Sequence, residues 1–205
     1  MPETTAEHSL RDIARNAVRE EVLRQAWNLF ASQGFEATTI DQVVEAAGMS
    51  RRTFFRYFSG KDELLLERLL ESGQSVADAL ARRPDDESAW HALRAAFDVI
   101  VISAEANAEP ARRLQLMLRD EPGVRSSLEE KHRRWVRMLA PLVERHLPGR
   151  GGSALRKVEA VAVAASALSC LSVAQNAWTD DTNTPLSEVL DAAMNAVHPL
   201  DHPGS

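Results

Sequence analysis

The chain of 205 residues contains little cysteine and no excess of basic charge. Its single cysteine, Cys170, excludes an internal disulfide and a cysteine-based zinc site, and it favours a reducing compartment. The 24 basic and 30 acidic residues give a formal net charge of -6, so a nucleic-acid partner must be met by a local basic patch. The 44% hydrophobic and 26% charged content excludes a fibre or a disordered chain and fits a globular protein.

Neither a signal peptide nor a convincing membrane span is expected from the sequence. The first 30 residues carry charges throughout, without the apolar stretch that a signal peptide needs, so we expect a cytoplasmic protein. Residues 160–179 are uncharged over about the length that spans a bilayer. They are dominated by alanine and interrupted by serine, glutamine and asparagine, so we expect a helix buried in protein and no membrane partner.

Common enzyme and metal motifs are missing as well. The chain contains no G-x-S-x-G, P-loop, dinucleotide-binding glycine run or H-E-x-x-H, and no cysteine–histidine dyad at a suitable spacing. His91, His132 and His146 are scattered, without a pair at i, i+4, so we expect neither a metal nor another cofactor. An enzyme is therefore the least favoured function.

The first part of the chain has the pattern of short helices joined by tight turns. Apolar residues at helical spacing over residues 23–31 predict a first helix that ends near Gly34. Thr39 and Gln42 have the spacing of a capping box, which predicts a short second helix that stops at Gly48.

The next segment, Met49–Lys61, holds four basic residues and no acidic one, and it holds four of the eleven aromatic residues. Ser50 is expected to cap a third helix from Arg51 to about Phe58, followed by a fourth helix over residues 62–82. Phe54 is expected to share with Phe58 the face that packs inward, while three arginines lie at the start and on the outer face.

A short helix, a tight turn and a second helix with a basic start form a helix-turn-helix, whose second helix presents side chains to base edges in the major groove. The alternative interpretation of the three arginines is an ordinary solvated helix face. The uninterrupted order of capping box, turn glycine, serine cap, basic helix start and aromatic cluster favours DNA binding.

Residues 34–66, GFEATTIDQVVEAAGMSRRTFFRYFSGKDELLL, resemble the DNA-binding domain of TetR-type transcriptional regulators. The resemblance implies an all-α protein with an N-terminal three-helix helix-turn-helix DNA-binding domain over residues 10–61. It implies a helical ligand-binding and dimerisation domain over residues 62–198, with flexible residues at 1–9 and 199–205.

The resemblance also implies a function. We expect a ligand-responsive repressor that binds a palindromic operator in double-stranded DNA as a homodimer and is released by a small hydrophobic or acyl-type effector. The alternatives are a transcriptional activator and a helical small-molecule-binding protein. The run RRTFFRYF resembles the subgroup of the mycofactocin-system regulator, some of whose relatives respond to acyl-coenzyme A esters.

The same resemblance assigns DNA contacts by position. Arg51 and Arg52 are expected to read guanine edges, and Thr39, Tyr57 and Lys61 to hold phosphates. This chain has Arg52 where the family usually has glycine, and Phe-Phe where it has Leu-Tyr, so the base preference cannot be transferred. The expected contacts are Thr39, Ser50, Arg51, Arg52, Thr53, Arg56, Tyr57 and Lys61.

The remainder of the chain is also helical in pattern. Pro141 lies inside a helical run over residues 122–147 and predicts a kink or division near Ala140. The neutral helix over residues 153–179 and a last helix over residues 185–197 are expected to form a four-helix dimer interface with those of a second subunit.

Large and polar side chains of this region are candidates for the effector pocket. Each has a plainer interpretation as core filler, and Cys170 is expected to be a small core residue. The candidates are Trp90, Phe97, Met117, Trp135, Met138 and Trp178, with Ser169, Gln175 or Asn176 as polar anchors.

Overall fold

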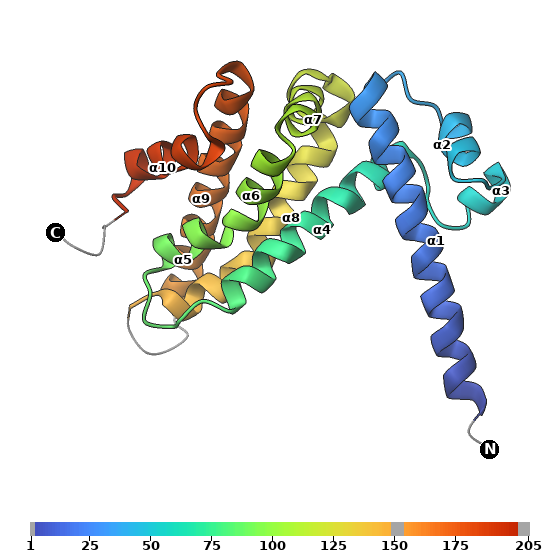
Figure 1. Ribbon diagram of the computed structural model, residues 1–205. Coiled ribbons are helices and arrows are strands. Elements are labelled where there is room, and N and C mark those ends of the chain that lie inside the picture. The colour runs from blue at the N-terminus through green and yellow to red at the C-terminus, as the bar shows by residue number, and fades with distance from the viewer. Residues whose placement is uncertain (1–2, 149–153, 201–205) are drawn as a thin grey trace.

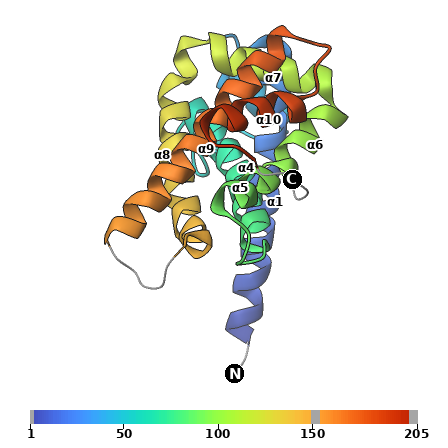
Figure 2. The same ribbon diagram turned by 90° about the vertical axis from the view of Figure 1, so that its left-hand side faces the viewer.

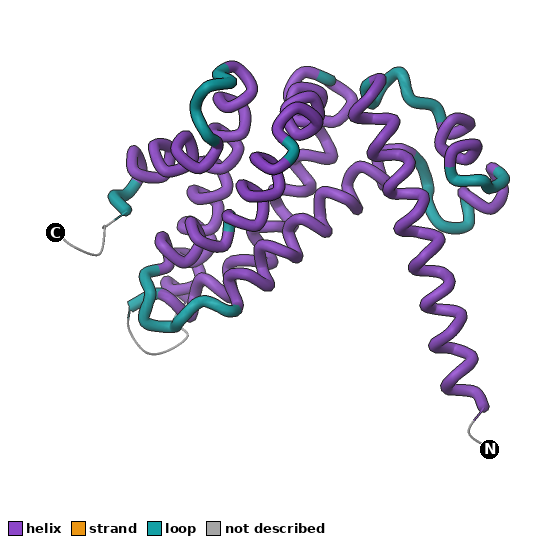
Figure 3. The backbone as a smooth tube through the Cα atoms, viewed as in Figure 1, coloured by secondary structure: helices purple, strands orange, loops and turns teal. Residues whose placement is uncertain are grey.

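The computed structural model describes residues 3–148 and 154–200, with side chains from residue 13 onward. Every regular element in these ranges is a helix, which confirms the all-α fold (Figures 1 and 3). The elements are α1 (Glu3–Gln33), α2 (Ile40–Ala46), α3 (Arg51–Phe54), α4 (Lys61–Ala81), α5 (Ala89–Ala96), α6 (Asp98–Ala106), α7 (Ala108–Asp120), the 3-10 helix η1 (Pro122–Val124), α8 (Arg125–Val143), the 3-10 helix η2 (Glu144–His146), α9 (Ala154–Asp180) and α10 (Leu186–Val197).

Helix α1 is long, and only its C-terminal half is buried against the rest of the protein. Leu23, Ala26 and Phe30 are buried there, at the helical spacing that the sequence shows. The helix ends as expected at Gly34, whose φ of 91° lies in the left-handed region that suits glycine. The N-terminal half projects away from the other helices (Figure 1) and is helical from Glu3, although residues 1–9 were expected to be flexible. Residues 1–2 and 201–205 lie outside the described residues.

The second and third helices begin where the sequence predicts. The Thr39 hydroxyl accepts a hydrogen bond from the Gln42 backbone N–H at 3.2 Å, and the Gln42 side chain accepts one from the Thr39 N–H at 2.9 Å. This capping box opens α2. The Ser50 hydroxyl accepts a hydrogen bond from the Thr53 N–H at 3.1 Å and opens α3.

The expected end of α3 at Phe58 is wrong, because the α-helix stops at Phe54. The N–H groups of Arg56 and Tyr57 bond to the carbonyls three residues back, so the chain tightens into turns there. The Tyr57 carbonyl accepts instead from the Arg19 guanidinium at 2.9 Å. This hydrogen bond connects the turn after α3 to α1, and the local sequence gives no sign of it.

Helix α4 joins two hydrophobic cores. Its first half contributes Leu64, Leu65 and Leu69 to a core shared with α1, α2 and α3. Its second half contributes Val76 and Leu80 to the larger core of the C-terminal helices. The first core also takes in buried side chains from α7 and η1, so packing crosses the boundary expected between residues 61 and 62.

The C-terminal helices pack as a bundle in which α8 lies between α4 and α9 (Figure 1), and α10 lies on α9 (Figure 2). Gly73 of α4 allows α8 to approach closely, because a Cβ atom there would collide with the Trp135 indole of α8. The indole N–H donates to the Leu69 carbonyl at 3.1 Å, and this hydrogen bond fixes α8 against α4.

Pro141 does not divide its helix near Ala140. Helix α8 continues through the proline to Val143 and then tightens into η2. Pro141 lies in the last turn of α8, so its missing N–H removes a single backbone hydrogen bond close to the end of the helix.

Helix α9 is the one described helix that is long and apolar enough to cross a membrane by length and composition alone. Its buried side chains include Ala164, Leu171 and Trp178, which pack in the bundle core. The core helix of a bundle passes the same test, so this helix is weak evidence for a membrane span.

Candidate DNA interface and ligand cavity

The basic surface predicted from the sequence lies at α3 and the turns that follow it. Arg51, Arg52 and Arg56 are exposed, whereas Phe54 and Phe58 are 0% and 2% exposed. The two phenylalanine rings lie 5.6 Å apart and pack in the N-terminal core, as expected. The aromatic side therefore anchors the segment and leaves its basic side uncovered.

Three predicted DNA contacts belong to helix caps. Thr39 and Ser50 use their hydroxyls for the caps of α2 and α3, and Thr53 lies 3.0 Å from the Ser50 hydroxyl through its own Oγ1. Thr39 and Ser50 are exposed, and their contact with DNA stays a prediction.

Arg51 and Arg52 differ in their surroundings. Arg51 donates to both carboxylate oxygens of Asp41 on α2, at 2.8 and 2.9 Å. Arg52 has no ion pair among the described side chains. Phe55, which the sequence analysis did not select, is 49% exposed beside them, with the Arg51 guanidinium 5.9 Å from its ring centre. The available signal in the sequence was a phenylalanine within a basic segment, off the inward face that Phe54 and Phe58 share.

The remaining predicted contacts lie at the end of this surface. The Arg56 guanidinium lies 5.9 Å from the Tyr57 ring centre. Lys61 lies at the start of α4, and its ammonium donates to the Phe35 carbonyl at 2.8 Å and lies 4.6 Å from the Phe35 ring centre. Lys61 thus holds the turn between α1 and α2, and its expected phosphate contact stays a prediction.

Glu121 holds the same turn from the C-terminal side. Its carboxylate accepts from the Phe35 N–H at 2.9 Å and from the Glu36 N–H at 2.7 Å. Gly34 makes this approach possible, because a Cβ atom there would lie 2.5 Å from the carboxylate oxygen. Glu121 comes directly after α7, so it connects a C-terminal helix to the helix-turn-helix. We call this the Glu121 contact; 85 residues of sequence separate its partners and hide it from sequence analysis.

Arg19 is a second residue that sequence reasoning missed. Besides the Tyr57 carbonyl, its guanidinium binds the carboxylate of Glu67 on α4 and lies 4.7 Å from the Phe58 ring centre. One α1 side chain therefore holds both α4 and the end of the α3 segment in place.

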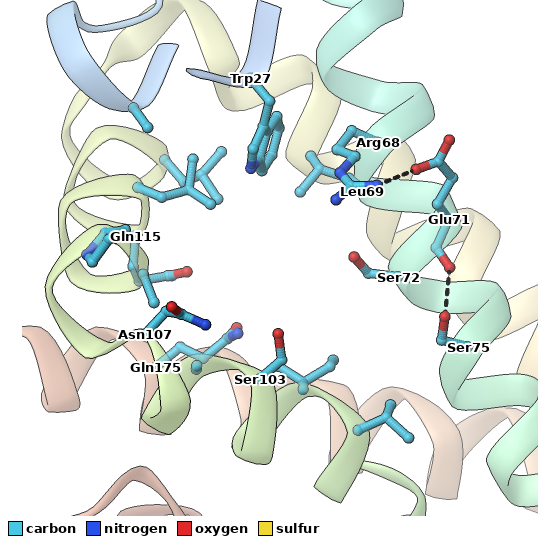
Figure 4. A pocket seen from close by; sticks show the side chains of 18 of the residues that line it. Trp27, Arg68, Leu69, Glu71, Ser72, Ser75, Ser103, Asn107, Gln115 and Gln175 are labelled. Carbon is cyan, nitrogen blue, oxygen red and sulfur yellow. Dashed lines mark hydrogen bonds and ion pairs between the residues drawn. The ribbon is translucent and has the colours of Figure 1, made fainter. Parts of the chain in front are cut away.

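A cavity of about 490 Å³ lies where the two parts of the protein meet (Figure 4). Its walls come from α1, α4, α6, α7, α8 and α9, with one residue from α10. Trp27 of α1 reaches into it from the DNA-binding side, opposite Gln175 of α9 and Ser103 of α6. At the edge formed by α4, Arg68 and Glu71 form an ion pair of 2.7 Å. The volume lies in the range of sites that enclose drug-sized ligands.

A second cavity of about 260 Å³ adjoins the first. The two cavities share Gln115, Leu118, Lys131, Trp135 and Gln175 in their walls. The second cavity is lined from α7, α8 and α9 only, so it extends the first one away from α1.

The structure brings together a part of the predicted effector residues. Trp135, Gln175 and Trp178 line the larger cavity, and Asn176 lines the smaller one. The other five line neither cavity. Trp90 and Phe97 are buried in the C-terminal core, Met138 packs against that core, Met117 belongs to the N-terminal core, and the exposed Ser169 bonds to the Ala165 carbonyl within α9.

Helical spacing alone did not separate cavity walls from core, because both kinds of position face inward. Cys170 is buried in the core, as expected, and burial raises the pKa of its thiol. Among the described residues, no group of three or more histidine, cysteine or acidic side chains could hold a metal ion.

Two family models match the chain. One described as "Bacterial regulatory proteins, tetR family" matches residues 22–67, and one described as "MftR C-terminal domain" matches residues 87–200. Together they cover the helix-turn-helix and the helices that form most of the cavity walls.

Individual proteins are similar over different lengths. TcmR of Streptomyces glaucescens, an HTH-type transcriptional regulator, is 35% identical over 92 residues, which are 45% of this chain and 41% of TcmR. The chain thus spans less than half of that relative. MftR of Mycobacterium tuberculosis, whose name assigns it to transcriptional regulation of mycofactocin biosynthesis, is 25% identical over 89% of this chain and 90% of MftR.

Solved structures of low identity share the fold. A TetR-family regulator from Syntrophomonas wolfei superposes with a TM-score of 0.66 at 12% identity, covering 88% of this chain and 93% of that one. FadR of Bacillus subtilis, solved in complex with stearoyl-CoA, gives 0.60 at 13% identity, covering 89% and 99%.

Proposed function

Because the chain belongs to the TetR family of bacterial regulatory proteins, whose members are transcriptional regulators and not enzymes, we propose that it is a ligand-responsive repressor. It binds a palindromic operator as a homodimer in the cytoplasm and leaves the operator when a small hydrophobic or acyl-type effector enters the larger cavity. The observation that carries the proposal is the uncovered basic start of α3 on an acidic chain.

Arg52 is the side chain best suited to read a base, since it is exposed and no carboxylate competes for it among the described residues. A bidentate contact with a guanine edge discriminates bases by about 1–3 kcal/mol. Arg51 reaches a base after its ion pair with Asp41 is replaced by a contact with DNA. The helix caps at Thr39 and Ser50 lie near the phosphates.

A homodimer fits the distribution of apolar surface. Among the residues whose side chains are described, eight large hydrophobic side chains are exposed, and five of these lie on α9 and α10, which face the viewer in Figure 2. They are Leu155, Val158, Val161, Val173 and Val197. Apolar surface gathered on two neighbouring helices is typical of an interface between proteins. Two subunits would present two α3 segments to half-sites about 34–36 Å apart, one turn of DNA.

The effector acts from the cavity on the DNA-binding helices. Trp27 of α1 and Leu69 of α4 line the cavity, and α7 leads from its wall to the Glu121 contact. A ligand that fits the cavity better when these helices have shifted favours the state that does not bind DNA, as release requires. Acyl-coenzyme A esters are the first effectors to screen, because FadR was solved with stearoyl-CoA.

The test is capture of genomic DNA by the purified full chain, followed by fluorescence anisotropy on the recovered site over a salt series. We expect a palindrome, a steep salt dependence and strong preference over random duplex. Arg52→Ala should weaken specific binding by about 1–3 kcal/mol and relax base choice. Arg82→Ala, at the far end of α4, is the matched control and should change neither.

Equal loss on operator and random DNA would exclude base reading by Arg52. Absence of any enriched sequence, from protein shown by mass spectrometry to carry no small molecule, would exclude the repressor. A transcriptional activator is the second candidate, and in vitro transcription from the captured promoter distinguishes it from a repressor.

A further inference from the structure

One charge in the cavity walls lacks a counterion. Lys131 of α8 lines both cavities, and the structure gives its ammonium no hydrogen bond or ion pair with any described side chain. The ammonium lies 4.7 Å from the Trp135 ring centre. A cation over an indole face gains some stabilisation, but this contact does not neutralise its charge.

The two arginines in the cavity walls already form ion pairs with carboxylates. On α4, Arg68 pairs with Glu71, the one carboxylate in the wall of the larger cavity. On α7, Arg119 lines the smaller cavity and pairs outward with Asp120 and Asp180.

The other polar groups around Lys131 are neutral or basic. His132 of α8 lines the smaller cavity, and α9 offers the neutral amides of Gln175 and Asn176. The two cavities together therefore carry an excess of positive charge at Lys131.

This lysine is costly to keep without a partner. Burial lowers the pKa of Lys131 from 10.5 to about 8, because removal from water disfavours the charged form. Near neutral pH the side chain still carries its proton, since its pKa stays above 7. Lys131 is half-buried, and a partly desolvated ammonium binds an anion more strongly than one in open water does.

We propose that Lys131 receives the acidic group of the effector, so that the cavity takes an anionic amphiphile with one carboxylate or phosphate on an apolar body. The apolar body lies among Trp27, Leu69 and Ile100 in the larger cavity, and the acidic group lies where the two cavities meet. The inference rests on the proposed function, in that it treats this cavity as the effector site. It adds a charge requirement that shape alone does not impose.

A pair of fluorescent probes that differ by one anionic group tests the proposal on the full-length protein. 8-Anilino-1-naphthalenesulfonate is an anion, and N-phenyl-1-naphthylamine has the same rings without the sulfonate. We expect Lys131→Met to weaken binding of the sulfonate by about 10- to 100-fold, because a hydrogen-bonded charge is lost. The neutral probe should bind the variant at least as tightly as wild type, which also reports that the cavity is intact.

Two further variants serve as controls. Lys131→Arg keeps the positive charge and should retain the preference for the sulfonate. Lys157→Met removes an exposed lysine of α9 that lines neither cavity and should leave both affinities unchanged. Displacement of the sulfonate by laurate or by dodecyl phosphate then distinguishes a carboxylate from a phosphate head group.

The proposal is overturned if Lys131→Met leaves the sulfonate affinity unchanged, if it weakens both probes equally, or if neither amphiphile displaces the dye. Failure of wild type to bind either probe overturns it too. The DNA capture experiment runs on the same preparation without any ligand. Protein that binds its operator but shows no preference for the anion refutes this inference and leaves the proposed regulator standing.

Discussion

Glu121→Gln is the most informative substitution for the connection between the two parts of the protein. The glutamine keeps the length of the side chain, but it offers one acceptor oxygen where the carboxylate offers two. One of the N–H groups of Phe35 and Glu36, now bound at 2.9 and 2.7 Å, must then lose its partner. A hydrogen bond to a charged acceptor contributes about 1.5–3 kcal/mol, and less at an exposed site such as the Glu36 N–H.

We therefore expect the free energy of unfolding to fall by about 1–2 kcal/mol. Amide exchange in residues 34–38 should accelerate about 5- to 30-fold, since the turn opens more readily. Hydrogen exchange by mass spectrometry measures the turn, and denaturant unfolding measures the whole chain. Operator affinity should also fall, because α2 and α3 follow the loosened turn.

The matched control is Glu129→Gln, an exposed glutamate of α8 without an ion pair or hydrogen bond among the described side chains. It should leave exchange in residues 34–38 unchanged. If Glu121→Gln also leaves that exchange unchanged, the Glu121 contact does not hold the turn, and the connection through α7 is refuted.

Three further substitutions test other parts of the structure. Asp41→Asn removes the carboxylate that holds an α3 arginine, so we expect about three- to tenfold tighter binding to operator and random DNA alike in anisotropy titrations, and unchanged affinity would contradict this. Gly73→Ala introduces a Cβ atom against the Trp135 indole and should lower the free energy of unfolding by about 1–3 kcal/mol. Gly60→Ala has open space around it and should cost less, since it changes only the N-cap of α4. Because the folded pKa of Lys131 is lowered to about 8, the unfolded chain binds more protons between pH 8 and 10.5, and stability rises with pH there. Lys131→Met should abolish that rise in denaturant unfolding, and the same rise in wild type and variant would refute it.

The helix-turn-helix was predictable because local chemistry specifies it. The capping box at Thr39, the Ser50 cap and the left-handed Gly34 each lie within a few residues of the feature that they control. The buried pair Phe54 and Phe58 followed from their spacing. The Arg19 bond to the turn after α3 was missed because Arg19 lies 38 residues away from the Tyr57 carbonyl that it binds.

The cavity was only partly predictable, for a different reason. Spacing on a helix reports which side chains face inward, but not whether they meet another side chain or an open space. Trp90 and Trp135 have the same sequence signature, yet only Trp135 lines the cavity. That difference depends on the relative positions of six helices, which no local pattern encodes.

Lys131 shows what this limit means for function. In the sequence it is a lysine within a charged helical stretch, next to Glu130, and such a pattern predicts a solvated face. In the structure Glu130 forms ion pairs with Arg133 and Arg134, and Lys131 lines the cavity without pairing with Glu130. The charge to which we assign the choice of effector is therefore available because two arginines pair with the neighbouring Glu130. The proposed preference for an anionic effector therefore rests on the pairing of charges along α8 as well as on the shape of the cavity.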